Sequence, residues 1–428
     1  MTELRELFED ATEAPPPTRL LADQVYAAGR RRRRRRAAAM AGTAFAVTAC
    51  AVATAAVVAM PGTGSGPAPV DDQVASAAPT GAPGVLPHPG RIQWMRAADS
   101  RHLYLALSTC SGGPCKTIWQ LVGSDDGGRT WTERGTPAQY ANALVLGPDL
   151  LLVDRTTEPL GGRPSTLVAS RDGGRSWQAT GTAPAVPAVA PGSFAVCRPD
   201  PETESGGTSI PGVEPCQVYA FDPVTNRVSP LTEQPAQILG DRQAIVESDG
   251  RLWAPGYDRE SARPAIATSV DGGRSWSSHT FAEMAVCGAY ECPQVQISIG
   301  PGGVDYAVVT DTRGRAVYRH TVAEGWQRRP GADQVPYEPS NPGSFVTPDG
   351  SHVVYQASTG PRGPGSGEYR FWAARRGGAS YQQVELRGLP PMFSPVLRAR
   401  DGWLYARGDG DVSYGSADGW TWVPLNRR

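Results

Sequence analysis

Lysine is almost absent from this chain. Of its 41 lysine and arginine residues only Lys116 is a lysine, and 42 aspartates and glutamates leave a formal net charge of −1. So balanced a charge gives no general attraction to nucleic acid or to an anionic membrane surface. The arginine bias, together with many alanines and glycines, indicates GC-rich codon usage rather than selection for phosphate binding. We therefore expect no nucleic-acid partner.

Metal-ligand patterns are missing as well. The five histidines are scattered, and no two of the seven cysteines have Cys-x-x-Cys spacing. Structural zinc sites need such ligands at short, regular spacing. The sequence therefore predicts no metal site and no cofactor.

Long helix-forming stretches are scarce after the first sixty residues. The 40 prolines and 50 glycines of the chain, most of which follow that segment, interrupt it at short intervals. This texture is typical of many short strands joined by turns, and it predicts an all-β fold.

The N-terminal segment is the exception. The arginine run Arg30–Arg36 is followed from Ala37 to Met60 by a stretch without a charged residue. About 20 apolar residues of helix cross a bilayer core, and flanking arginines remain on the cytoplasmic side. Residues 37–60 are therefore predicted to be a single transmembrane signal-anchor helix, so that the membrane itself is a partner. Residues 1–36 would then form a cytoplasmic tail.

This topology has one alternative. Ala53-Thr54-Ala55 is similar to a signal-peptidase site, so the chain could instead be secreted after cleavage. A signal h-region runs about 7–15 residues, which is shorter than this segment and favours the anchor. Residues 61–90 are dominated by Gly, Pro, Ala and Ser and are predicted to be a flexible spacer before an exported domain at 91–428.

The exported part carries an internal repeat. The string SDDGGRTW at 124–131 recurs as SRDGGRSW at 170–177 and SVDGGRSW at 269–276, and a degenerate copy, SADGWTW, lies at 416–422. The hydroxyl and carboxylate can hydrogen-bond the main chain of a tight turn, the glycines permit positive φ, and the tryptophan buries a large ring. We expect these residues to be structural rather than ligand-binding. They are Ser124, Asp126, Gly128, Trp131, Ser170, Asp172, Gly174, Trp177, Ser269, Asp271, Gly273, Trp276, Ser416, Asp418 and Trp422.

This pattern, Ser-x-Asp-x-Gly-x-x-Trp, resembles the Asp box of sialidase-like BNR repeats, and the chain looks like a membrane-anchored propeller of actinobacterial type. The resemblance implies a β-propeller built from four-stranded blades, with the boxes on outer turns far from any active centre. It covers residues 91–428 as a fold, and its specific part is the boxes.

Between the boxes the chain follows one strand pattern. Trp131, Trp177, Trp276, Trp326, Tyr381 and Trp422 fall in final strands that recur at blade-length intervals of about 48 residues. We predict seven blades, at 91–135, 136–182, 183–235, 236–282, 283–330, 331–389 and 390–428. Six is the alternative, because residues 197–232 offer no clear second strand. The strand order leaves open whether the ring closes with a swapped strand.

Six cysteines outside the apolar segment fall into close pairs, Cys110–Cys115, Cys197–Cys216 and Cys287–Cys292, while Cys50 lies in the predicted span. Export would place the pairs in an oxidising compartment, where disulfides form. Proximity along the chain favours these three links over the other connectivities.

The loops joining second to third strands are predicted to gather on the face opposite the box turns. An arginine-rich rim with an aromatic residue can hold a carboxylate through bidentate hydrogen bonds. We therefore expect this face to bind an acidic glycan, a cell-wall component or a protein partner, although solvated loop charges fit the same pattern. The candidate residues are Arg155, Glu158, Arg163, Tyr257, Asp258, Arg259, Glu260, Arg263, Arg313 and Arg362.

The resemblance also raises an enzymatic alternative, an exo-sialidase-like glycoside hydrolase. Sialidases hold the substrate carboxylate with an arginine triad and use a tyrosine nucleophile. Their first arginine lies in an Arg-Ile-Pro motif, whereas this chain has Arg91-Ile92-Gln93 and no motif that places the remaining catalytic residues. Sialidase catalytic domains are also six-bladed, and a fold does not carry a function. We therefore assign no catalytic residue and favour a non-catalytic binding or assembly module of the cell envelope.

Overall fold

The computed structural model describes residues 83–111, 116–135, 139–156, 166–199, 215–240, 245–248, 250–288, 292–311, 314–337, 343–357, 368–390, 395–408 and 411–427. The predicted tail, the predicted span at 37–60 and most of the spacer lie outside these residues. No helix within the described ranges has the length and hydropathy that a bilayer crossing requires. The helical element described is a short 3-10 helix, η2 (Pro330–Gln334).

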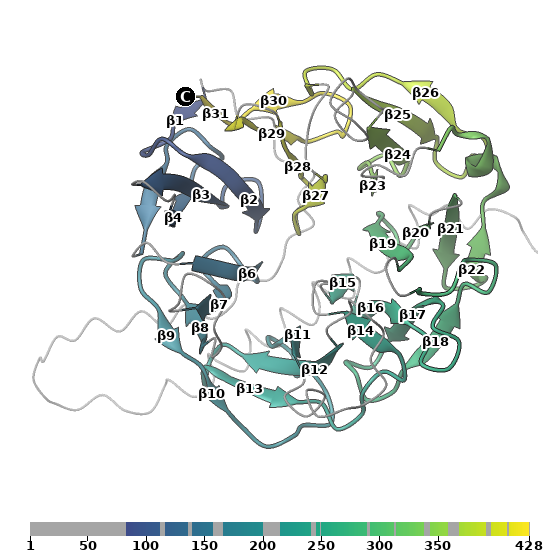
Figure 1. Ribbon diagram of the computed structural model, residues 1–428, viewed down its shortest axis with the longest axis horizontal. Coiled ribbons are helices and arrows are strands. Elements are labelled where there is room, and N and C mark those ends of the chain that lie inside the picture. The colour runs from purple at the N-terminus through teal and green to yellow at the C-terminus, as the bar shows by residue number, and fades with distance from the viewer. Residues whose placement is uncertain are drawn as a thin grey trace, which may run out of the picture. The chain divides into compact units, whose positions relative to one another are not determined.

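Seven antiparallel blades form a ring (Figure 1). Five of them are separate four-stranded sheets. Blade 1 contains β2 (Arg91–Ala97), β3 (Leu103–Ser111), β4 (Lys116–Ser124) and β5 (Thr132–Arg134). Blade 2 contains β6 (Gln139–Val145), β7 (Leu151–Thr156), β8 (Thr166–Ser170) and β9 (Gln178–Ala179). Blade 5 contains β19 (Gln294–Ile299), β20 (Asp305–Thr310), β21 (Arg315–Thr321) and β22 (Gly325–Arg328). Blade 6 contains β23 (Gly343–Val346), β24 (His352–Ala357), β25 (Tyr369–Ala374) and β26 (Gln382–Val384), and blade 7 contains β27 (Leu397–Arg398), β28 (Leu404–Arg407), β29 (Ser413–Ser416) and β30 (Val423–Pro424).

Blades 3 and 4 are joined in one larger sheet. Blade 4 contains β16 (Arg251–Tyr257), β17 (Pro264–Ser269) and β18 (Ser277–Thr280), and its inner strand is split into β14 (Ile238–Gly240) and β15 (Val246–Ser248), which both pair with β16. Blade 3 contains the antiparallel strands β11 (Phe194–Pro199), β12 (Pro215–Asp222) and β13 (Arg227–Pro230). Its fourth strand, β10 (Gly181–Thr182), pairs in parallel with β13, and β14 also pairs with β12.

The prediction of seven four-stranded blades is therefore confirmed, and the six-bladed alternative is wrong. The region that offered no clear second strand, 197–232, reaches four strands differently from the other blades. The segment leaving blade 2 supplies β10 at the outer edge of blade 3. A hydrophobic alternation of period two cannot show this, because β10 is only a two-residue strand whose burial pattern is exposed at both positions.

The ring closes without a swapped strand. Blade 1 and blade 7 each consist of strands that are consecutive in the sequence. Closure comes from a short parallel pair, β1 (Gly84–Val85) with β31 (Asn426–Arg427), which lies beside blade 1 (Figure 1). The Gly84 N–H donates to the Gly128 carbonyl (2.9 Å) in the first box turn. The two ends of the described propeller are thereby held against one box.

Apolar side chains fill the junctions between neighbouring blades. Leu103 and Leu105 of blade 1 pack with Trp403 and Tyr405 of blade 7, and all four are almost completely buried. Burying a large apolar side chain contributes roughly 1.5–3 kcal/mol, so these junctions hold the ring together.

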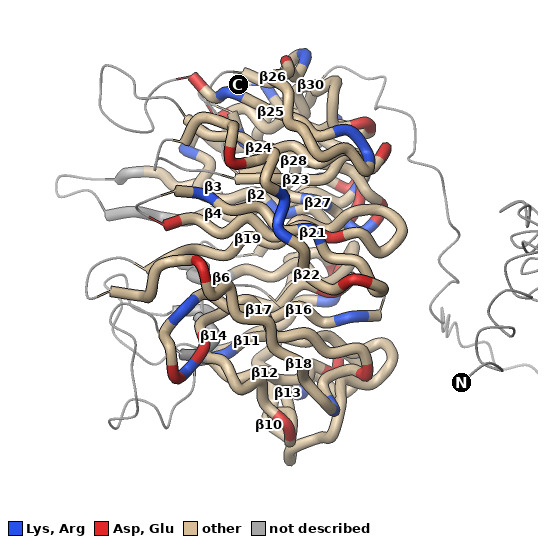
Figure 2. The backbone as a smooth tube through the Cα atoms, turned by 90° about the vertical axis from the view of Figure 1, so that its right-hand side faces the viewer, with Lys and Arg blue, Asp and Glu red and all other residues tan. Residues whose placement is uncertain are grey.

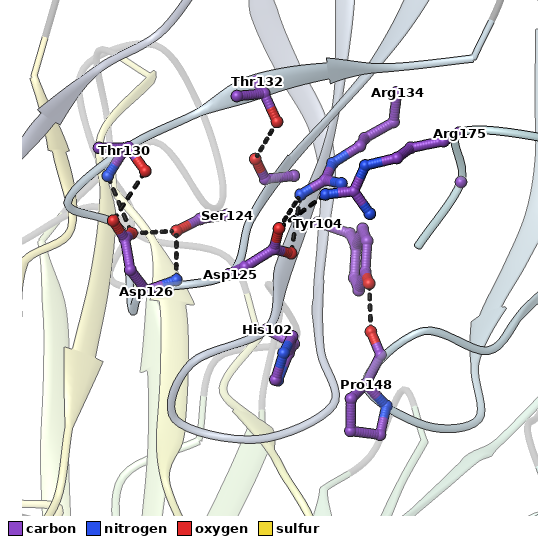
Figure 3. A network of polar contacts seen from close by, with 12 residues as sticks. His102, Tyr104, Ser124, Asp125, Asp126, Thr130, Thr132, Arg134, Pro148 and Arg175 are labelled. Carbon is purple, nitrogen blue, oxygen red and sulfur yellow. Dashed lines mark hydrogen bonds and ion pairs between the residues drawn. The ribbon is translucent and has the colours of Figure 1, made fainter. Parts of the chain in front are cut away.

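The complete boxes form the same hydrogen-bonded turn. In the first, the Ser124 hydroxyl donates to Asp126 (2.8 Å) and accepts the Gly128 N–H (2.8 Å) (Figure 3). Asp126 also accepts the N–H of Thr130 (2.9 Å). The second and third boxes repeat these bonds within 0.1 Å. In the third, for example, Ser269 accepts the Gly273 N–H at 2.7 Å. The degenerate fourth copy keeps the glycine bond, from Gly419 N–H to the Ser416 hydroxyl (2.8 Å).

Box tryptophans contact the chain that leaves the preceding blade. The Trp131 indole N–H lies 3.3 Å from the carbonyl oxygen of Leu425, which follows blade 7. The Trp276 indole donates to the Glu233 carbonyl (3.2 Å) after blade 3. At the fourth box, the Trp422 main-chain N–H donates to the Arg387 carbonyl (2.8 Å) after blade 6. These contacts join neighbouring blades, and the ring closure at Leu425 is one more case of the same junction.

Candidate functional site

The predicted ligand face includes the loop between β16 and β17, residues 257–263. Asp258 begins an Asx turn, because its carboxylate accepts the main-chain N–H of Ser261 (2.8 Å) and the Ser261 hydroxyl (2.5 Å). These hydrogen bonds, led by the hydroxyl, lower the pKa of Asp258. Ala262 completes the turn with a φ of 53°, a left-handed conformation that is uncommon for a non-glycine residue. The loop therefore has one defined shape.

A disulfide packs against this loop. Cys287 and Cys292 are bonded, and both pack with Ala262 against Tyr257. The Cys287 N–H donates to the Ala262 carbonyl (2.8 Å), and the Tyr257 hydroxyl donates to the carbonyl of Pro293 (2.8 Å). Tyr257 is only 4% exposed, and burial raises its pKa. The disulfide and the residues around it thus hold the loop in place.

Arg263 ties the loop to the chain between blades 4 and 5. Its guanidinium donates to the main-chain carbonyls of Ala282 (2.6 Å) and Met284. The adjacent Ala285 N–H donates to Asp311 of blade 5 (3.0 Å). The Tyr337 hydroxyl donates to the Asp311 carbonyl (2.6 Å). The loop therefore rests on two blades.

These contacts divide the candidates in this loop. Tyr257, Asp258 and Arg263 are engaged in holding the loop, whereas Arg259 and Glu260 are exposed at its tip. Asp311 and Tyr337, which complete the support, were not among the residues predicted from the sequence. Asp311 accepts the Gly314 N–H (2.9 Å), and the Asp-x-x-Gly spacing was the signal that could have indicated a turn there.

Of the other candidates, one lies in a described strand and the rest lie outside the described residues. Arg155 lies in β7, where its main chain pairs with Thr166. Glu158, Arg163, Arg313 and Arg362 lie outside the described residues, as does Cys115 of the predicted Cys110–Cys115 pair. The other two predicted disulfides, Cys197–Cys216 and Cys287–Cys292, are confirmed.

Charged groups near the box turns bind one another across neighbouring blades, unlike the exposed Arg259 and Glu260. Arg134 is 1% exposed and donates to both oxygens of Asp125 (2.7 Å each), and Arg175 of the next blade binds the same carboxylate (2.8 Å) (Figure 3). Although burial opposes it, the bonds from Arg134 and Arg175 hold the pKa of Asp125 below its usual value. This network joins blades 1 and 2. Figure 2 shows positions of basic and acidic residues interspersed along the described chain on the side that faces the viewer.

One arginine near the start of β2, where the resemblance would place the first catalytic arginine of a sialidase, serves the fold. Arg407 of blade 7 donates to the carbonyls of Ile92 and Gln93, and Asp411 accepts the Ile92 N–H (2.9 Å). These bonds belong to the junction of blades 7 and 1. Among the described residues no group of three His, Cys, Asp or Glu side chains could hold a metal ion.

The fold and these contacts define a seven-bladed propeller with a supported loop on one face. No protein-family model matches the chain, and no relative was found among curated proteins. Among solved structures the chain is similar to a GH74 xyloglucanase from Xanthomonas campestris, with 15% identity and a TM-score of 0.37 over 78% of this chain and 47% of that one. The chain thus spans about half the length of that enzyme.

Two further similar structures are shorter. An intramolecular trans-sialidase from Ruminococcus gnavus matches with 14% identity and a TM-score of 0.35, over 79% of this chain and 95% of that one. An uncharacterised protein from Listeria monocytogenes matches with 9% identity and a TM-score of 0.44, over 80% and 97%. These likenesses concern the fold and assign no activity to this chain.

Proposed function

We propose that this propeller is a non-catalytic binding module of the cell envelope, anchored by the predicted helix at residues 37–60. Its partner binds at the loop 257–263. The observation that carries the proposal is the presentation of Arg259 and Glu260, exposed on a loop that an Asx turn, a disulfide and Arg263 hold in one shape. A preorganised loop loses little conformational entropy on binding, which favours affinity. The two disulfides also suit an oxidising, extracytoplasmic compartment.

The chemistry of the loop tip suits a partner of mixed charge. Arg259 can hold a carboxylate through two parallel hydrogen bonds, while the adjacent Glu260 can accept from an amine or hydroxyl and repels a second carboxylate. Cell-wall peptides and protein surfaces offer carboxylates beside amines. A uniformly acidic glycan offers carboxylates alone, and we expect it to bind more weakly.

The test uses the full chain, solubilised in detergent, and measures its binding to isolated cell wall, to protein extracts of the envelope and to immobilised acidic glycans. Arg259→Glu should weaken binding about tenfold or more, because the carboxylate of the partner would meet a like charge. The matched control is Arg376→Glu, another exposed arginine, in the turn between β25 and β26. Equal binding by both variants and the unaltered chain would exclude this loop as the site.

The sialidase-like alternative has its own test. Purified full-length chain is incubated with a fluorogenic sialoside, and release of the fluorophore is followed. We expect no turnover above the buffer rate. Turnover that survives Arg259→Glu would replace the binding proposal by an enzymatic one.

The anchor is tested separately. The intact mass of the chain isolated from membranes should include residues 1–60, because an anchor is retained whereas a signal peptide is removed. A mature N-terminus after Ala55 would show a secreted protein and leave the binding loop unaffected.

A further inference from the structure

A cleft of about 310 Å³ lies between the outer parts of blades 4 and 5, and its residues Arg251 and Thr268 are at the other end of β16 and β17 from the loop 257–263. Its walls come from β17 and β18 on one side and from β21 and β22 on the other, which are neighbours in the ring (Figure 1). Its lining includes Arg251, Ser278, His279, His320 and Trp326. Small-molecule sites start at about this volume.

The cleft lies where blade 5 departs from the box pattern. Blades 1, 2, 4 and 7 have a box between their last two strands, whereas blade 5 has only the short turn between Thr321 and Gly325. Trp326 follows this turn as a box tryptophan would, and its ring packs against Trp253 of the preceding blade, with ring centroids 5.4 Å apart. His320 lies 4.8 Å from Trp253 and 5.0 Å from Trp326. His320 and Trp326 thereby form an aromatic wall of the cleft.

The rim of the cleft is apolar. Val270 and Val322 line its two sides and are 71% and 74% exposed. They are two of the five exposed large hydrophobic residues in the described chain. Exposed apolar residues that gather at one cavity indicate a binding site more strongly than scattered ones do. The ligand should therefore have an apolar body that covers the valines and stacks on Trp326.

The polar groups of the cleft favour an anion. Arg251 lines the cleft and supplies its positive charge, which an ion pair with the buried Asp305 of blade 5 offsets in part (Nη1–Oδ2 4.0 Å). Ser278 and Thr268 add hydroxyls, and none of the described residues lining the cleft is a carboxylate or carboxamide. Burial and the charge of Arg251 lower the pKa of His320 to about 4, and burial lowers that of His279, so both imidazoles are neutral at pH 7. A sugar, whose many hydroxyls need strong acceptors, fits this donor-rich lining less well than a carboxylate.

We propose that this cleft binds a small carboxylate with a flat or branched apolar body, the carboxylate toward Arg251 and the apolar body on Trp326 between the two valines. The chemistry is the same for a free aromatic acid and for the last residue of a peptide chain. The site is independent of the loop 257–263 and of the function proposed for it.

The test measures binding to the full chain in detergent by titration calorimetry and ligand-observed NMR. The probes are 3-phenylpropionate as a free acid, N-acetyl-phenylalanine as a mimic of a chain end, and N-acetyl-phenylalanine amide as its uncharged counterpart. Both acids should bind and the amide should bind at least about tenfold more weakly. Preference for the free acid or for the chain end identifies the source.

Two variants locate the binding. Ser278→Glu places a carboxylate in the cleft and should weaken both acids about tenfold or more, since Ser278 is exposed and the fold should tolerate the change. The matched control, Val224→Glu, adds the same charge at an 84% exposed position in blade 3 and should leave binding unchanged, as should Arg259→Glu. The proposal is overturned if no acid binds at millimolar concentration, if the amide binds as well as the acid, or if Ser278→Glu has no effect.

Discussion

The two ends of strand β17 use the same turn chemistry for opposite purposes. At one end, the third box binds the carboxylate of Asp271 to the hydroxyl of Ser275 (2.7 Å). At the other, Asp258 binds the hydroxyl of Ser261 (2.5 Å). The box directs Trp276 to the neighbouring blade, whereas the loop leaves Arg259 and Glu260 exposed. An aspartate and a serine thus shape a turn, and the residues beside them decide whether it joins blades or meets a partner.

The box side should be the more sensitive of the two, and Gly128→Ala should have the largest effect. Gly128 has a φ of 89°, and a Cβ there would lie 2.5 Å from the Leu425 carbonyl oxygen at the ring closure. We expect a loss of about 3 kcal/mol in the free energy of unfolding, measured by urea titration.

The control for that substitution is Gly302→Ala. Gly302 also has a positive φ, of 71°, but a Cβ there would meet nothing within 4 Å. It should cost only about 1 kcal/mol, the strain of the backbone alone. Equal losses at both positions would show that contact with the closing segment is unimportant.

Removing the loop disulfide should have the next largest effect. The bond closes a loop with a sequence separation of 5 residues. Cys287→Ser with Cys292→Ser should therefore lower stability by about 2 kcal/mol in the chain-entropy view. Hydrogen exchange should rise in residues 257–263 and remain unchanged in the box turns. A rise spread over the whole ring would contradict a local supporting role.

Arg263 and Arg259 separate support from presentation within the loop. Arg263→Ala removes bonds to two main-chain carbonyls and should cost about 1 kcal/mol. Arg259→Ala removes an exposed side chain and should change stability by less than about 0.5 kcal/mol while weakening partner binding. If Arg259→Ala lowered the thermal stability more than Arg263→Ala, Arg259 would be the supporting residue.

The smallest expected effect is a pH dependence of the third box. Hydrogen bonds from Ser275 and Ser269 lower the pKa of Asp271 to about 2 from 3.8. A folded-state pKa below the unfolded one contributes stability that is fully present above the unfolded value and is lost as the pH falls through 2. The difference in urea midpoint between the unaltered chain and Asp271→Asn should therefore shrink between about pH 5 and pH 2.5. A difference independent of pH would show that the carboxylate charge has no part in the turn.

The fold was predictable because each box contains all the residues that form its turn. Ser, Asp, Gly and Trp at fixed spacing are enough for the bonds seen at 124–131, 170–177 and 269–276. Two cysteine pairs were predictable for a similar reason, since they are close in the sequence. The strand β10 was not, because its pairing depends on a neighbouring blade.

The candidate site was predictable only in part. Tyr257, Asp258 and Arg263 were chosen as ligand residues for their chemistry, yet the structure uses them to hold the loop. An arginine that meets two carbonyls and an arginine that meets solvent look alike in a sequence. Asp311 and the cleft at Trp326 escaped notice because their partners come from another blade or from distant strands.

The sequence by itself determined the local geometry of this protein, above all the box turns, and it favoured seven blades without excluding six. Local hydrogen bonds and backbone conformations set these, and both involve residues a few positions apart. The tertiary structure alone decided how the ring closes at Leu425, which arginine of the 257–263 loop is exposed, and that a cleft opens beside the boxless turn of blade 5. Those outcomes depend on which blades become neighbours, and contacts between blades join residues as far apart in the chain as Trp131 and Leu425.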